Sequence, residues 1–133
     1  KQVDIETLKK KSEILSLHLP ETNLTKGLID TKFALSMRNS FWLINTARGK
    51  CVVLKDLLKC LENGKILGAA LDVLEFESSS FSSIFYDEKN SRIINELANM
   101  DNVILSPHVA GSTNESYRKL SEVILRKILC EFS

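Results

Sequence analysis

The chain has 133 residues, of which 44% are hydrophobic and 26% are charged, a balance typical of one globular domain with its own core. Its formal net charge of +1 gives no indication of binding to nucleic acid or to an acidic membrane surface. No apolar run approaches the roughly 18 residues of a membrane-spanning helix, and the first residues lack the apolar segment of a signal peptide.

Cysteine and histidine usage points to a reduced, metal-free protein. The three cysteines, Cys51, Cys60 and Cys130, are an odd number and show no C-x-x-C spacing. Neither His18 nor His108 has a cysteine at the spacing of a zinc site. We therefore expect free thiols in a cytoplasmic protein and no metal centre.

Predicted helices and strands alternate along the chain. In order, they are a helix at residues 5–11, a strand at 14–19, a helix capped by Asp30 to about 36, a strand at 41–45, a helix at 53–61, a strand at 67–73, a helix at 92–99, a strand at 103–105 and a last helix. Ser112 and Glu115 form a predicted capping box for the last helix. Its apolar residues Tyr117, Leu120 and Ile124 share one face with Ile128.

This alternation is typical of an α/β fold. The strands are continuous apolar runs, which predicts a parallel sheet covered by helices on both faces. The small residues of G-A-A, starting at Gly68, favour close packing by a helix. The serine-rich stretch 78–83 is predicted to be a loop.

Five polar residues come at or just beyond the ends of predicted strands. His18, Arg48, Asp72 and His108 each end or follow a different strand, and Glu77 lies five residues beyond Asp72. Taken singly, each is more often a solvated or structural residue than a functional one. Ligands of open parallel sheets, however, bind at the carboxyl ends of the strands, so the shared edge favours a binding site.

The residues around these positions form four motifs in a specific order. H-L-P-E-T-N-L-T-K-G-L-I, I-N-T-A-R-G-K, G-A-A-L-D-V-L-E-F-E and S-P-H-V-A-G-S-T follow one another along nearly the whole chain. The sequence thereby resembles the D-isomer-specific 2-hydroxyacid dehydrogenases, a family that includes phosphoglycerate, glycerate and D-lactate dehydrogenases. The resemblance implies an NAD-dependent enzyme that moves a hydride between its cofactor and a small D-2-hydroxy acid or 2-keto acid, with 3-phosphoglycerate among the candidates.

The resemblance also implies roles for individual residues. By motif position, the catalytic residues are Arg48, Glu77 and His108. The implied cofactor-binding residues are His18, Leu19, Pro20, Thr46, Ala47, Arg48, Asp72, His108, Ala110 and Gly111.

The residue types suit this chemistry. Arginine offers a planar fork to a substrate carboxylate, and Gly49 behind it leaves the backbone free to turn. Histidine can take up and return a proton near neutral pH. A carboxylate at Glu77 would favour the protonated ring of His108 and select its tautomer.

The sequence departs from the family's pattern in two places. Its five glycines contain no G-x-G-x-x-G spacing, the signature of the turn that binds the dinucleotide pyrophosphate. Ser78 follows Glu77, where the family usually has proline. We therefore expect residues 1–133 to be the C-terminal half of a Rossmann-like NAD-binding domain with a returning C-terminal helix. The glycine-rich half and the substrate domain are expected to precede the first residue.

Several alternatives stay open on the sequence alone. The residue that would distinguish NAD from NADP and the residues that select the hydroxy acid belong to the parts that this chain lacks. We expect a homodimer without nucleic-acid or membrane partners, and an isolated chain without activity. The second functional class is a cofactor-binding co-repressor or scaffold that resembles the family but is not a dehydrogenase.

Overall fold

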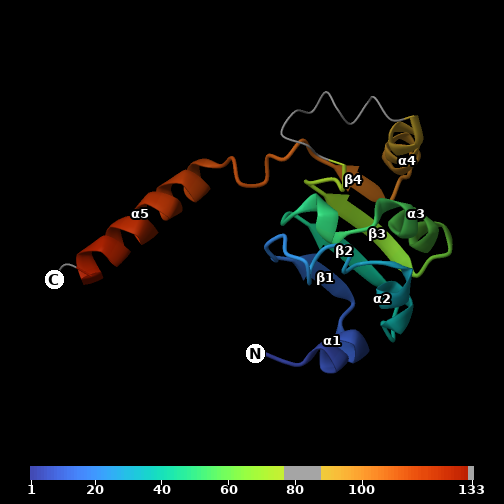
Figure 1. Ribbon diagram of the computed structural model, residues 1–133, viewed down its shortest axis with the longest axis horizontal. Helices are drawn as coiled ribbons and strands as arrows, with labels where there is room; N and C mark the ends of the chain where they lie inside the picture. Colours follow the sequence, from blue (N-terminus) through green and yellow to red (C-terminus); the bar gives the residue numbers. More distant parts are fainter. Residues whose placement is uncertain (77–87, 132–133) are drawn as a thin grey trace.

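The computed structural model describes residues 1–76 and 88–131 (Figure 1). Its elements in chain order are α1 (Ile5–Lys11), β1 (Ile14–Leu17), α2 (Thr31–Ser36), β2 (Phe41–Asn45), the 3-10 turn η1 (Gly49–Cys51), α3 (Leu54–Glu62), β3 (Ile66–Leu71), α4 (Glu88–Ala98), β4 (Val103–Leu105) and α5 (Asn114–Glu131). The predicted alternation is confirmed. The first strand ends two residues earlier than predicted, which leaves His18 and Leu19 in the following loop. None of the helices in the described ranges is apolar and long enough to cross a membrane.

The four strands form one parallel sheet in the order β1-β2-β3-β4 (Figure 1). The register places Leu15 beside Leu43, Leu43 beside Ala69, and Leu71 beside Leu105. Because every pair is parallel, the carboxyl ends of all four strands lie at the same edge. The predicted α/β architecture is therefore confirmed, and each loop that follows a strand starts from this edge.

The hydrophobic core lies on one face of the sheet. Side chains from alternate strand positions, such as Leu15 and Leu43, point to that face and are buried. Helices α2, α3 and α4 contribute Ala34, Leu57 and Leu97, which belong to the same cluster. All three connections between parallel strands thus place their helices on the same side, as the right-handed crossover rule requires.

The opposite face of the sheet is uncovered in the described part of the chain. Ile14, Trp42 and Ile104 point to this side with 63%, 49% and 69% of their surface exposed. The indole of Trp42 lies over Gly68, where an added Cβ would come within 2.3 Å of the ring atom Cζ3. The prediction of helices on both faces is therefore wrong for these residues, and the small residue Gly68 accommodates a side chain rather than a helix. Apolar strands indicate burial on both faces, but they do not say what covers each one.

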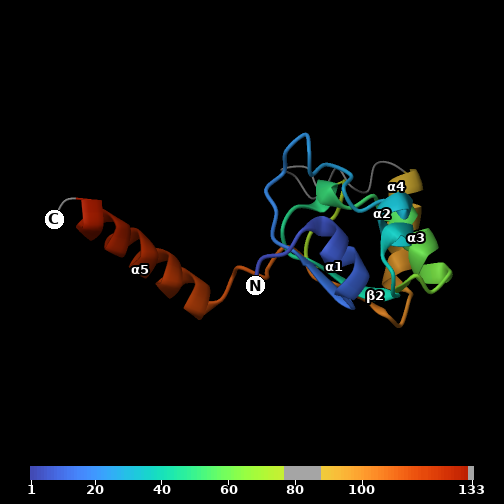
Figure 2. The ribbon, with the colours of Figure 1, turned by 90° about the horizontal axis from the view of Figure 1, so that it is seen from below.

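Helix α5 projects away from the sheet in both views (Figure 1, Figure 2). It contains no buried residue, and its apolar side chains Tyr117, Leu120 and Ile124 are more than half exposed. The Thr113 hydroxyl accepts a hydrogen bond from the Ser116 N–H at 3.1 Å, so Thr113 caps the helix. The predicted capping box at Ser112 was wrong by one residue. Both positions carry a hydroxyl, and only the backbone geometry distinguishes them.

Candidate active site

The loops that follow the four strands bring most of the predicted site residues to one edge of the sheet. His18, Leu19 and Pro20 follow β1; Thr46, Ala47 and Arg48 follow β2; Asp72 follows β3; and His108, Ala110 and Gly111 follow β4. Glu77 lies outside the described residues. The common edge predicted for the other polar residues is therefore confirmed.

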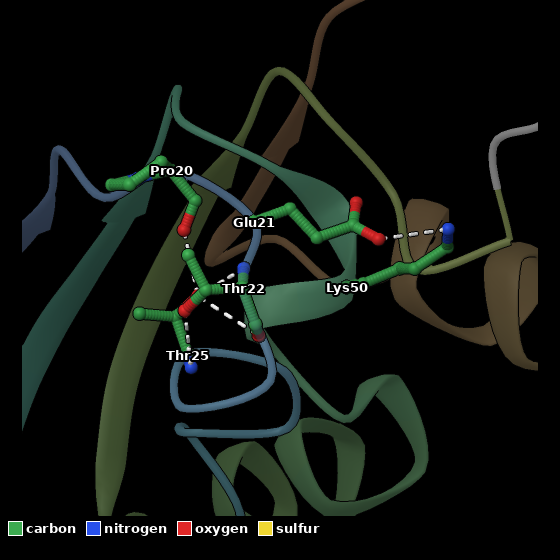
Figure 3. A network of polar contacts seen from close by, with 5 residues as sticks. All are labelled: Pro20, Glu21, Thr22, Thr25 and Lys50. Atoms are coloured by element: carbon green, nitrogen blue, oxygen red, sulfur yellow. Dashed lines mark hydrogen bonds and ion pairs between the residues drawn. The ribbon is translucent and has the colours of Figure 1, made fainter.

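The loop after β1 is bound to the loop after β2 (Figure 3). The Thr25 hydroxyl donates to the Pro20 carbonyl at 2.6 Å and accepts from the Thr22 N–H at 2.9 Å, which closes a tight turn. Glu21 and Lys50 form an ion pair at 3.0 Å between the two loops. Because both side chains are about 40% exposed, this pair contributes at most about 1 kcal/mol. A backbone hydrogen bond of 2.8 Å from the Gly27 N–H to the Lys50 carbonyl holds the loops together more firmly.

The imidazole of His18 is hydrogen-bonded to β1, the strand that precedes it. Its Nε2 is 2.9 Å from the hydroxyl of Ser16, whose side chain points away from the core. Both residues are exposed. His18 therefore lies at the end of β1, the first strand in the sheet order. Arg48 and His108 follow β2 and β4.

A buried asparagine organises the loop that carries Arg48. Asn45, the last residue of β2, is completely buried, and its Oδ1 accepts from the Ala47 N–H at 3.1 Å. Its Nδ2 donates to the Arg48 carbonyl, also at 3.1 Å. The exposed Arg48 side chain donates one guanidinium hydrogen bond to the Ala47 carbonyl at 2.6 Å. Asn45 was not among the site residues predicted from the sequence. A polar residue at the end of an apolar strand could have indicated a structural role for it.

Gly49 permits close contact between two of the loops. A Cβ at this position would lie 1.9 Å from the carbonyl oxygen of Leu74, in the loop after β3. Its backbone does not adopt the left-handed conformation, so freedom to turn is not the reason for a glycine here. The Glu75 carboxylate adds a second link, because its Oε2 accepts from the Leu54 N–H at the start of α3 at 2.8 Å.

The Asp72 carboxylate shapes the loop that carries His108. Its Oδ1 accepts from the Ser106 hydroxyl at 2.6 Å and from the Val109 N–H at 2.8 Å, and its Oδ2 accepts from the Ala110 N–H at 2.9 Å. His108 lies inside this turn with a φ of 54°, a conformation that is rare for a residue with a side chain. Three hydrogen bonds to a charged acceptor therefore stabilise the backbone that presents the imidazole.

Asp72 is only 4% exposed, yet its carboxyl stays ionised. Burial by itself would raise the pKa of Asp72, but the hydrogen bonds and the nearby His108 outweigh it. The pKa of Asp72 therefore lies below its ordinary value of 3.8.

Comparison with known proteins matches residues 1–110 to a family described as D-isomer specific 2-hydroxyacid dehydrogenase, NAD binding domain. The chain belongs to this family. The match extends from α1 through the turn that carries His108, and the family predicted from the four sequence motifs is thereby confirmed.

Individual members of the 2-hydroxyacid dehydrogenase family align with nearly the whole chain. A glyoxylate reductase from Thermofilum pendens is 37% identical over 95% of the chain, and a D-3-phosphoglycerate dehydrogenase from Haemophilus influenzae is 35% identical over 97%. The chain spans 34% and 30% of the lengths of these two relatives, about a third.

Solved structures of the family share the fold. The NAD-complexed D-isomer specific 2-hydroxyacid dehydrogenase from Lactobacillus delbrueckii superimposes with a TM-score of 0.76 at 37% identity, covering 96% of this chain and 39% of that chain. A D-lactate dehydrogenase from Aquifex aeolicus, complexed with NAD and lactic acid, has the same TM-score at 32% identity, covering 98% and 40%. The Rossmann-like sheet with flanking helices is thus the fold of a 2-hydroxyacid dehydrogenase NAD-binding domain.

The Gly49 contact generates a stability prediction. We expect Gly49→Ala to lower the free energy of unfolding by about 2–3 kcal/mol, because the obstructing atoms belong to rigid backbone and the loops must separate. Urea denaturation of the full-length protein would measure this change. Gly111→Ala is the matched control, since an added Cβ there meets no atom within 4 Å. Equal stability of Gly49→Ala and the unsubstituted protein would contradict the close contact.

The pKa of Asp72 generates a prediction about pH. Asp72→Asn should destabilise the full-length protein near neutral pH by about 1–3 kcal/mol, because an amide nitrogen would face the Ala110 N–H. The folded-state pKa of Asp72 is below the unfolded one, so its stabilisation is fully present well above pH 3.8 and is lost as pH falls through the folded-state value. Denaturation curves of both proteins at a series of pH values should therefore converge in acid. A difference independent of pH would show that the carboxylate charge plays no part.

Proposed function

We propose that the protein transfers a hydride between a nicotinamide cofactor and a small D-2-hydroxy acid or its 2-keto acid. The observation that carries this proposal is the pair of buried polar residues, Asn45 and Asp72, at the ends of β2 and β3. They bind the backbones of the two loops from which Arg48 and His108 extend at one edge of the sheet. No observation favours a co-repressor or scaffold without activity.

The proposed catalytic residues are Arg48, Glu77 and His108. Arg48 binds the substrate carboxylate through its guanidinium fork, for which its exposed position on the loop after β2 is suitable. His108 accepts the hydroxyl proton when the hydroxy acid is oxidised and returns it when the keto acid is reduced. Glu77 is assigned by its motif position alone, and we propose that its carboxylate orients the His108 ring.

The residues at this edge suit the nicotinamide end of the cofactor. Oδ2 of Asp72 accepts one hydrogen bond, which leaves it capacity to accept another from an amide group such as the nicotinamide carboxamide. When bound, the cofactor supplies the acceptor or donor of the hydride. The other proposed cofactor contacts are His18, Leu19, Pro20, Thr46, Ala47, Arg48, His108, Ala110 and Gly111. We propose that the pyrophosphate is bound outside these 133 residues, since their glycines lack the G-x-G-x-x-G spacing.

We further propose a cytoplasmic homodimer. Cys51, Cys60 and Cys130 are all free thiols, which suits a reducing compartment. Burial and the nearby Asp56 raise the pKa of Cys60, which makes this thiol less reactive. The dimer is proposed because the uncovered sheet face and α5 both expose contiguous apolar side chains.

Substitution of Arg48 tests the proposed carboxylate contact. In the full-length protein, Arg48→Lys should lower kcat/KM for 2-keto acid reduction at least about tenfold, mainly through a higher KM, because lysine cannot make the bidentate contact. Steady-state kinetics with a panel of 2-keto acids would measure the effect. Lys50→Arg is the matched control, because Lys50 is a nearby half-exposed cation that pairs with Glu21. Wild-type kinetics for Arg48→Lys would remove Arg48 from the substrate site.

The 133-residue chain by itself tests the proposed division of the domain. We expect it to be inactive, to bind NAD no tighter than about millimolar, and to self-associate through its uncovered apolar surfaces. Calorimetric titration with NAD and light scattering would test these expectations together. Ile104→Lys, on the uncovered face, should shift the chain toward monomer without disturbing the core, because Ile104 is 69% exposed. A monodisperse monomer that binds NAD at micromolar concentration would contradict the proposal.

A further inference from the structure

Asn45 is the only completely buried polar side chain among the described residues. Its amide cannot reach water, and an unpaired buried amide would cost about 1–3 kcal/mol. Both ends of the amide are paired, and both partners lie within the next three residues of the chain. The two hydrogen bonds fold the backbone of Thr46–Arg48 back toward the end of β2.

We propose that Asn45 is a positioning residue for Arg48. The inference rests on the proposed function, in which Arg48 binds the substrate carboxylate. Asn45 Oδ1 accepts from the backbone N–H of Ala47, the residue before Arg48. Asn45 Nδ2 donates to the backbone carbonyl of Arg48 itself. The direction in which the arginine side chain leaves the loop is therefore determined by the asparagine.

Asn45 also connects the Arg48 loop to the neighbouring strand β3 through a backbone hydrogen bond. Its backbone carbonyl accepts from the Asp72 N–H at 2.9 Å, where β3 ends. The residue that holds the Arg48 loop is thus hydrogen-bonded to the residue that holds the His108 loop. A shift of Asn45 would alter the position of Arg48 relative to the histidine loop, and a carboxylate contact loses strength when its donor fork is misplaced.

The amide group is specific to this task, because one end accepts and the other donates. Aspartate has the same shape, but its ionised carboxylate can only accept. Asn45→Asp would keep the bond from the Ala47 N–H and would place a second acceptor against the Arg48 carbonyl, with almost no change in volume. Protonation of the new carboxyl would restore a donor, and burial raises the pKa of an aspartate at such a position.

The experiment compares Asn45→Asp, Asn45→Ala and Asn102→Ala in the full-length protein. Asn102 is the matched control, because its amide also donates to a backbone carbonyl, that of Leu67 at 2.8 Å, but at the opposite edge of the sheet. Each protein would be assayed for 2-keto acid reduction. Oxamate, a carboxylate analogue of a 2-keto acid, would be titrated calorimetrically into the protein with NADH present, which measures binding without turnover.

We expect Asn45→Asp to weaken oxamate binding and to raise the KM for the keto acid, each at least about tenfold near neutral pH. Oxamate is titrated at saturating NADH, because Thr46, Ala47 and Arg48 are also proposed cofactor contacts and the Kd for NADH is expected to rise with the displaced loop. As pH falls, oxamate binding by Asn45→Asp should approach that of the unsubstituted protein at the same pH, because the protonated carboxyl donates to the Arg48 carbonyl. Asn45→Ala should show the weaker binding without this recovery, and Asn102→Ala should bind oxamate normally even if its Tm falls.

Two negative results are distinguishable. If the unsubstituted protein reduces no 2-keto acid, the proposed function is refuted and this inference is refuted with it. If reduction is observed but Asn45→Asp keeps its oxamate Kd and KM within about twofold, only the role of Asn45 is overturned. A loss in Asn45→Asp that merely follows the fraction of unfolded protein, with no recovery at low pH, would likewise show a purely structural residue.

Discussion

The carboxylate of Asp72 is the interaction on which the geometry of the sheet edge depends. It joins the end of β3 to a turn that begins more than thirty residues later, with three donors converging on two oxygen atoms. Hydrogen bonds to a charged acceptor are roughly twice as strong as neutral ones. Their combined strength is sufficient to maintain the left-handed backbone of His108, which costs on the order of 1–3 kcal/mol. The imidazole is thereby presented from a backbone that the histidine would not adopt unaided.

The loop after β2 is also held by hydrogen bonds from a buried side chain to the loop backbone, but over a shorter stretch of chain. Asn45 binds backbone atoms only two and three residues ahead, so it determines a local turn rather than a contact between distant segments. Gly49 then lets this turn approach the loop after β3 until backbone meets backbone at Leu74. At this point the backbones of the two loops are in direct contact. A backbone shift in either loop would therefore displace the other loop as well.

Local pattern predicted the fold well and the site in part. The apolar runs at Phe41–Asn45 and Val103–Leu105 were predicted at their observed bounds, because strands that pack at least partly against a core have a strong sequence signal. The four motifs led to the correct family. Periodicity could not reveal that one face of the sheet is uncovered, since burial depends on what packs there. The role of Asn45 and the reason for Gly49 depend on contacts between loops, which sequence spacing does not encode; the assignment of Glu77 stays a prediction.

The uncovered face also has an optical consequence. Trp42 is the only tryptophan of the chain, and its half-exposed indole lies on that face over Gly68. Indole emission shifts to shorter wavelength when water around the ring is replaced by apolar groups. Any segment or partner that covers β2 on this side would therefore shift the emission maximum of the intrinsic fluorescence to shorter wavelength. These 133 residues contain no second tryptophan whose emission would overlap with it. Trp42 can therefore report whether the sheet face that the described helices leave open is occupied.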